Sequence, residues 1–150
     1  MKNTSFLLKI TIMTWFFFCG YMLYMLFWPI TPYKYNKYPL PILTPTVHMG
    51  GVVTYVRDYC KSVKGPADVT HSFQKKLTTQ EMKDHITDVT VILDTYHNTN
   101  TPMGCHVVYN DIKVPNIKRG TYRIIQTIHG KINPFRVSNE EYYTEWFTVI

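Results

Sequence analysis

The chain has 150 residues and carries 16 Lys or Arg against 10 Asp or Glu, a formal net charge of +6. Two of the bases precede a long apolar segment, so the remainder holds 14 bases (16 − 2) and all 10 acids, a net charge of +4 (14 − 10). An excess of this size is typical of a soluble surface, and the longest basic runs are only the pairs 75–76 and 118–119, which argues against a nucleic-acid-binding stripe.

Residues 10–30 form an apolar segment of 21 residues without a formal charge. A helix of that length spans roughly 30 Å, the thickness of the hydrocarbon core of a bilayer. Thr11 and Thr14 can return their hydroxyls to the helix's own carbonyls, and the prolines at 29 and 32 stop the helix. Rings with polar tips suit the headgroup level, and four near the C-terminal end are expected interface anchors: Tyr21, Tyr24, Trp28 and Tyr33.

Three other interpretations of this segment are weaker. A cleaved signal peptide has a shorter apolar core and a small-residue exit, whereas Trp28-Pro29-Ile30 stands where the cut would fall. Lipoprotein processing at Cys19 conflicts with the three phenylalanines before it, and a buried globular helix of this length would show a polar face. We therefore expect a short tail (1–9) and an uncleaved transmembrane anchor helix (10–30) in contact with membrane lipid.

The two sides of the segment differ little in basic residues, and this count with the short N-terminal tail favours a cytoplasmic N-terminus. The C-terminal domain would then be periplasmic or extracellular. The next residues, 31–45, are rich in proline and are expected to form an extended, semi-rigid stalk. Beyond the anchor the chain has two cysteines, Cys60 and Cys105, which would form a disulfide in an oxidising compartment; two buried thiols are the alternative.

Strand patterns recur from residue 50 onward. Residues 75–85 are polar and Thr79 with Met82 gives only a poor helix start, so we expect a loop or a frayed edge there. After Gly120 the residues alternate, with Tyr122, Ile124 and Ile128 on one face and polar residues on the other, up to a turn at Asn133-Pro134. The other predicted strands are 52–60, 67–73, 88–96, 105–114 and 142–150.

About seven strands without intervening helices predict a mainly β fold, an antiparallel sandwich or a small barrel. Pro115, Gly120 and Tyr122 have a spacing that resembles the corner before the penultimate strand of immunoglobulin-like sandwiches, which makes Gly120 and Tyr122 candidate corner or core residues. The ending at 146–149 resembles their final strand. The resemblance covers residues 46–150 and implies an immunoglobulin-like β-sandwich, although the inter-sheet tryptophan of antibody domains is absent.

A second resemblance concerns the overall plan. The segments Asp58-Tyr59-Cys60, Gly104-Cys105-His106 and Ile132-Asn133-Pro134-Phe135-Arg136, together with one apolar span, are similar to small uncharacterised single-span membrane proteins of tailed bacteriophages. This likeness implies a fold and a membrane setting, but no known activity.

The sequence offers no converging set of catalytic residues. The six histidines show no H-x-x-x-H spacing, and His97, the best candidate for a surface site, is better interpreted as a solvated loop residue. Cys105 and His106 are neighbours on a strand and so point to opposite faces. The aspartates at 84, 88 and 94 match no compact calcium cage, and phosphate, dinucleotide and serine-nucleophile motifs are missing. We expect no enzyme, no metal and no cofactor.

The sequence therefore favours a non-catalytic, membrane-anchored protein-binding or scaffolding module that uses loops or a sheet edge, for example as an accessory subunit of a membrane complex. The alternative is a phage-encoded envelope-active protein that perturbs or remodels the host membrane. The aromatic share of 15%, with Arg123 and Arg136 near the last hairpin, could furnish an exposed recognition face, but aromatic residues in a small β domain are more often its core. Partner and oligomeric state stay open.

Overall fold

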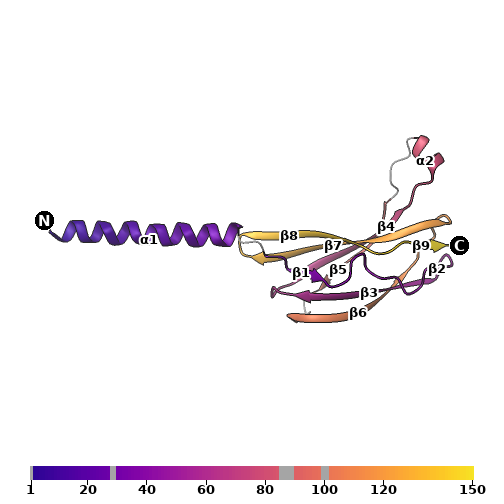
Figure 1. Cartoon of the computed structure of the whole chain (residues 1–150), viewed down its shortest axis with the longest axis horizontal. Helices are drawn as coiled ribbons and strands as arrows, with labels where there is room; N and C mark the ends of the chain where they lie inside the picture. The colour runs from indigo at the N-terminus through magenta and orange to yellow at the C-terminus, as the bar shows by residue number, and fades with distance from the viewer. Residues whose placement is uncertain (1, 28–29, 85–89, 99–101) are drawn as a thin grey trace.

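The computed structural model describes residues 2–27, 30–84, 90–98 and 102–150, with side chains left out for residues 2–5 and 90–98. An N-terminal helix, α1 (Lys2–Phe27), extends away from a β-rich part that holds the C-terminus at its far end (Figure 1). Within α1 the residues Phe6–Phe27 are long and apolar enough to cross a membrane. The hydroxyls of Thr11 and Thr14 donate to the carbonyls of Leu7 and Ile10, as predicted.

The helix begins earlier than the sequence predicted. Residues expected as a tail, 1–9, are helical from Lys2 onward, and the helix ends at Phe27 rather than at residue 30. No proline or glycine interrupts residues 2–10, so the helix of the apolar segment continues backward through them.

The β strands form two sheets. One has the order β1-β3-β6; the other has the order β2-β9-β7-β4-β5, with β8 also paired to β7. All strand pairs are antiparallel except β2 with β9. The strands are β1 (Tyr33–Tyr35), β2 (Thr46–Val47), β3 (Val52–Lys61), β4 (Ala67–Lys75), β5 (Thr90–Asn98), β6 (Gly104–Lys113), β7 (Gly120–Asn133), β8 (Arg136–Tyr143) and β9 (Phe147–Val149).

The mainly β fold is confirmed, but the strand list differs from the prediction of about seven antiparallel strands. The predicted strand 142–150 is interrupted: its first residues end β8 and its last residues form β9, both beside β7. At the interruption Thr144 is buried and its hydroxyl accepts a hydrogen bond from the Ile124 amide. The predicted turn at Asn133-Pro134 does join β7 to β8.

The two sheets share a core that falls into two apolar clusters. The larger cluster joins Val53 and Tyr55 of β3 to Phe73 of β4 and to Tyr122 and Ile124 of β7. The smaller cluster contains Tyr33, Tyr59, Ala67, Val69 and Ile128. Inward positions alternate with outward ones along β3 and β7, so the predicted inner face of the strand after Gly120 is confirmed.

Residues 31–45 are built into the β domain and are not the free stalk that the sequence predicted. Tyr33–Tyr35 pairs with β3, and Tyr33, expected at the membrane interface, is only 6% exposed and packs in the smaller cluster. Leu40 is fully buried in the larger cluster, and its amide donates to the Tyr143 carbonyl at 2.9 Å. The segment bends at residues 36–39, and its apolar residues gain more by burial than by solvation.

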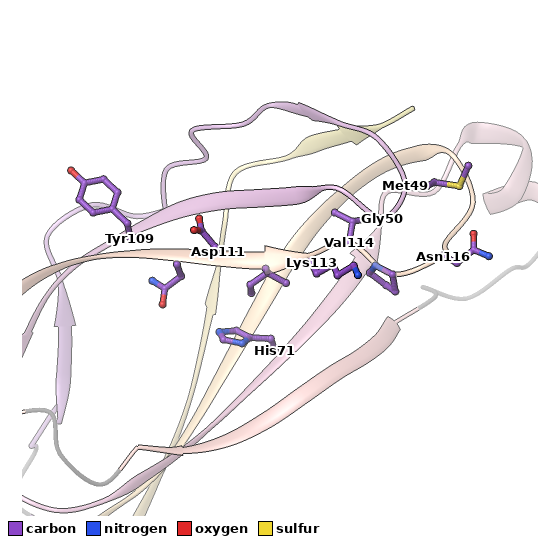
Figure 2. Close-up of a pocket in the computed structure, with 11 residues that line it drawn as sticks. Met49, Gly50, His71, Tyr109, Asp111, Lys113, Val114 and Asn116 are labelled. Atoms are coloured by element: carbon purple, nitrogen blue, oxygen red, sulfur yellow. The ribbon is translucent and has the colours of Figure 1, made fainter.

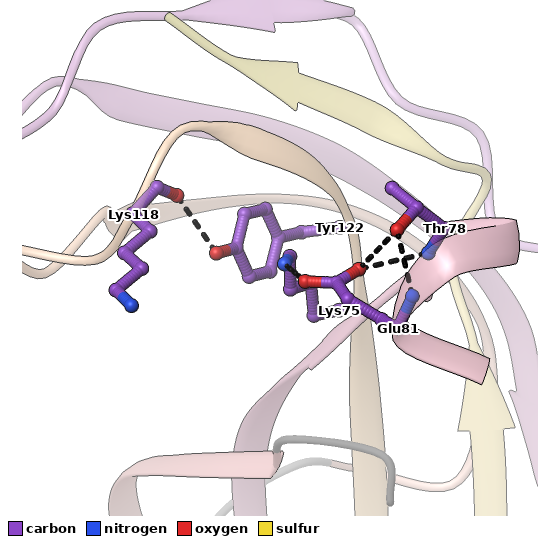
Figure 3. A network of polar contacts seen from close by, with 5 residues as sticks. All are labelled: Lys75, Thr78, Glu81, Lys118 and Tyr122. Atoms are coloured by element: carbon purple, nitrogen blue, oxygen red, sulfur yellow. Dashed lines mark hydrogen bonds and ion pairs between the residues drawn. The ribbon is translucent and has the colours of Figure 1, made fainter. Parts of the chain in front are cut away.

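A short helix, α2 (Thr79–Lys83), replaces the expected loop or frayed edge at 75–85. The helix begins with a capping box at Thr78, one residue before the predicted start at Thr79. The Thr78 hydroxyl accepts a hydrogen bond from the Glu81 amide, and the Glu81 carboxylate accepts one from the Thr78 amide at 2.8 Å. Lys75 at the end of β4 forms an ion pair with Glu81 (Figure 3). The helix is thus held to the sheet by a local polar network, without a buried apolar residue.

This network gives a pH-dependent contribution to stability. Chiefly through its hydrogen bond with Lys75, and then through those with Thr78, the pKa of Glu81 is lowered from 4.5 to about 2. Because the pKa is lower in the folded chain, the contribution is fully present above pH 4.5 and is lost as pH falls toward 2. In urea titrations, Glu81→Gln should therefore destabilise the protein near neutral pH and converge on the parent near pH 2. The control is Glu141→Gln, because Glu141 is also exposed. If Glu81→Gln lowered the free energy of unfolding equally at every pH, the network around Glu81 would not be the source of this pH dependence.

Candidate functional site

Strand β6 ends the three-stranded sheet, and in the described part of the chain only β3 pairs with it. The other side of β6 is therefore a strand edge whose backbone groups can accept a further strand. Its outward side chains include two large apolar groups, Val107 at 60% and Tyr109 at 67% exposure. These apolar groups occupy the middle of β6, before the exposed charges of Asp111 and Lys113 on the same face. Exposed apolar groups on an edge strand are a feature that natural proteins usually cover or charge.

A pocket of about 970 Å³ wraps the C-terminal half of this edge and is lined by Met49, Gly50, His71 and residues 109–116 (Figure 2). Its lining includes both outward residues of β6, such as Asp111, and inward ones, such as Ile112. His71 reaches the pocket from β4, below β6 in the view of Figure 2. The pocket thus lies between β6 of the three-stranded sheet and β4 of the six-stranded sheet.

A polar layer lies at the wall of the pocket and behind it. His71 and the half-buried Asn110 line the pocket, and Arg57, Gln126 and Tyr55 are buried. His71 Nε2 lies 2.9 Å from Tyr55 Oη, and this hydroxyl donates to Gln126 Oε1 at 3.4 Å. Arg57 Nη2 donates to Asn110 Oδ1 at 2.8 Å. On each inner strand the polar residue separates the two apolar clusters: Arg57 follows Tyr55, His71 precedes Phe73, and Gln126 follows Ile124.

The polar layer is not fully satisfied. Gln126 is completely buried, and its Nε2 has no hydrogen-bond partner among the described residues. Such a group costs about 1–3 kcal/mol unless a partner or water reaches it. The layer can orient the imidazole of His71 at the pocket wall through its contact with Tyr55. On the neighbouring strand β5, Asp94 pairs in register with His71.

The predicted disulfide is present: Cys60 and Cys105 are bonded and lie directly opposite each other on β3 and β6. The bridge joins neighbouring strands of one sheet, unlike the inter-sheet bridge of antibody domains. Tyr122 is buried, and its hydroxyl donates to the Lys118 carbonyl at 2.7 Å across the turn that begins β7 (Figure 3). A Cβ on Gly120 would lie 3.4 Å from the Tyr122 ring, so a side chain there would crowd this corner.

Of the other predicted site residues, Tyr21 and Tyr24 are exposed on α1, while Trp28 lies outside the described residues. Tyr33 is in the core, as noted. Asp84 caps the end of α2, Asp88 is outside the described residues, and the side chains of Asp94 and His97 are not described.

Arg123 lies on an aromatic surface of the larger sheet. Its guanidinium is 4.2 Å from the Tyr143 ring centroid and 4.9 Å from that of Trp146, and Nε donates to Gln74 Oε1 at 2.6 Å. Arg136 belongs to the opposite end of the β7–β8 hairpin, so the two arginines do not form one face. The stacking and the hydrogen bond hold Arg123 in place against the sheet.

In the described ranges, no group of three or more His, Cys, Asp or Glu could hold a metal ion. No protein-family model matches the chain, and no curated protein is similar to it. Two solved structures share part of its arrangement. Pseudomonas fluorescens alkylpurine DNA glycosylase AlkC, bound to DNA containing an abasic site analog, has a TM-score of 0.43 and 8% identity over 79% of this chain and 30% of that chain. The Bacillus subtilis sporulation control protein Spo0M has a TM-score of 0.44 and 9% identity over 80% and 50%. Similarity this low carries no argument about function.

Proposed function

We propose that the protein is a single-pass membrane protein whose immunoglobulin-like domain binds a protein partner without catalysis, by accepting a partner strand at the edge of β6. The observation that carries the proposal is this apolar edge beside an open pocket. A strand added to β6 would gain main-chain hydrogen bonds along the edge, and its inward side chains would enter the pocket next to His71.

Two features support the setting. The side chains of α1 from Phe6 to Phe27 are exposed or half-buried, which leaves an apolar helix of 22 residues, about the thickness of a bilayer, in need of a lipid environment. The disulfide between Cys60 and Cys105 is the kind of bond that persists in oxidising compartments, which favours a domain outside the cytoplasm and an N-terminus within it.

Substitutions at exposed β6 positions test the proposal. Tyr109→Lys or Val107→Lys places a charge in the contact while leaving the fold intact, because both side chains are solvent-exposed. In pull-downs of the full chain in mild detergent, we expect the parent to retain a stoichiometric partner. Each variant should weaken that association about 30-fold, the effect of losing an interface hot spot of about 2 kcal/mol.

The matched control is Leu43→Lys. Leu43 is 53% exposed, and its backbone pairs with β3 on the side away from β6. It should retain the partner as the parent does. Equal retention by all three variants would refute the edge as the interface, and a chain that always purifies alone would refute the binding role. Recovery of the chain in carbonate-washed membranes tests the anchor separately.

A further inference from the structure

Three segments that lie at the end of the β domain nearest to α1 are residues 30–34, 62–66 and 131–136 (Figure 1). Ser62 ties the first two together, since its hydroxyl donates to the Thr31 carbonyl at 2.8 Å and its amide to the Pro32 carbonyl at 3.0 Å. The third segment is the tip of the β7–β8 hairpin, which meets the end of α1 (Figure 1). We refer to these three segments as the helix-proximal end.

The hairpin tip lies at the level of the last helical turn. Asn133 Nδ2 donates to the Met25 carbonyl at 2.7 Å, so it satisfies one of the carbonyls that the end of a helix leaves without an internal partner. Met25 belongs to the apolar stretch Phe6–Phe27. If that stretch crosses the bilayer, Asn133 and the tip residues beside it lie at the depth where the helix leaves the hydrocarbon.

The tip presents an apolar side chain at this depth. Phe135 is 58% exposed, and its amide donates to Asn133 Oδ1 at 2.9 Å, which fixes the turn. An exposed phenylalanine at the tip of a hairpin, held at the level of a membrane helix end, suits insertion among lipid headgroups.

The charge of the helix-proximal end has one sign. Its three segments contain no Asp or Glu, and they carry four bases, three of them exposed: Lys34, Lys64, Lys131 and Arg136. Acids gather elsewhere, such as Glu81 and Asp84 on and after α2. Where the leaflet that faces the domain contains anionic lipid, each base close to its surface strengthens the contact about fivefold, so these residues act together.

We propose that the β7–β8 hairpin tip is a second membrane contact, in which Phe135 enters the headgroup region and the surrounding bases bind anionic lipid headgroups. The inference rests on the proposed role of α1 as the membrane span. It gives the domain a fixed orientation on the bilayer, with the β6 edge pointing sideways along the membrane, and it excludes free rotation about a flexible stalk.

The test uses an environment-sensitive fluorophore on a cysteine in the full chain, in a Cys19→Ser background with the native disulfide kept intact. Phe135→Cys is compared with Leu43→Cys, which is also exposed but lies in the segment that pairs with Thr54 of β3. Both are reconstituted in vesicles of phosphatidylcholine with and without phosphatidylglycerol. At position 135 we expect a blue-shifted emission and quenching by spin-labelled lipid, both stronger with phosphatidylglycerol, and neither at position 43.

Reversal of two exposed bases, Lys64→Glu with Lys131→Glu, should then weaken the contact at position 135 by at least about tenfold and remove its dependence on phosphatidylglycerol. An unshifted, unquenched probe at 135 in chains that stay in carbonate-washed vesicles would overturn the hairpin contact while the anchor stands. Chains that the wash removes would overturn the anchor and the contact together. If neither phosphatidylglycerol nor the charge reversal changed the emission and quenching of the probe at position 135, binding to anionic lipid would be refuted.

Discussion

Replacing Phe73 by alanine should lower the free energy of unfolding by about 3–5 kcal/mol. Phe73 is fully buried on β4, and its ring lies 5.6 Å from that of Phe147 and 6.4 Å from that of Tyr122. These three rings join β4, β7 and β9 at the centre of the larger cluster. Removing the Phe73 ring leaves a cavity that the other two rings cannot both shift to fill. The decrease in the free energy of unfolding should therefore lie in the upper part of this range. Urea unfolding of the full chain in detergent measures it.

Leu43→Ala is the control, because an apolar side chain is lost from an exposed position and should change stability by less than about 0.5 kcal/mol. A typical domain is stable by only about 5–15 kcal/mol, so Phe73→Ala should also reduce the yield of folded protein. Equal effects of the two substitutions would mean that the larger cluster is not the core that holds the sheets together.

The parts of the fold that could be predicted are those that depend on local periodicity. The alternation of Tyr122, Ile124 and Ile128 fixed the inner face of β7, because side chains on a strand point to opposite faces in turn. The helical segment was predictable from its length and lack of charge, and the pairing of Cys60 with Cys105 from the absence of other cysteines beyond it.

The parts that could not be predicted depend on contacts between distant segments. The proline-rich stretch looked like a stalk because nothing local shows that Leu40 is buried in the same cluster as Phe147, a residue more than a hundred positions later. The parallel pairing of β2 with β9 is equally remote in sequence. Helix α2 was not predicted for a local reason. Its capping box starts at Thr78, whereas Thr79 with Met82 was considered as the helix start.

The buried polar layer had a signal that was overlooked. Along β3 the inward positions run Val53, Tyr55, Arg57 and Tyr59, so a charged residue occupies the apolar phase of a strand. His71 on β4 and Gln126 on β7 do the same. Polar residues in that phase must find partners inside the protein, and three such residues on strands of the two facing sheets predict one shared layer. This layer is what places His71 at the pocket beside β6.

Loss of the disulfide should produce the second large effect, and it should act on the proposed interface directly. The bond joins residues 45 positions apart, for which the loop-entropy relation gives about 4 kcal/mol, and measured losses are typically about 2–4 kcal/mol. Cys60→Ala with Cys105→Ala should lower the free energy of unfolding by that amount. Since β6 pairs only with β3 in the described residues, the loss should also loosen the edge that we propose as the binding strand.

Reduction of the parent protein should produce the same drop in stability, and a reducing agent should leave the double variant unchanged. Cys19→Ser removes the remaining cysteine, which is free on α1, and should affect neither stability nor partner retention. If the double variant kept its stability but lost the partner, the bond would serve only to hold the edge of β6 in its binding geometry. If it lost stability but kept the partner, strand β6 would not be the interface. A parallel loss of both is the expected result, because one covalent bond fixes the strand to the sheet and presents its free edge.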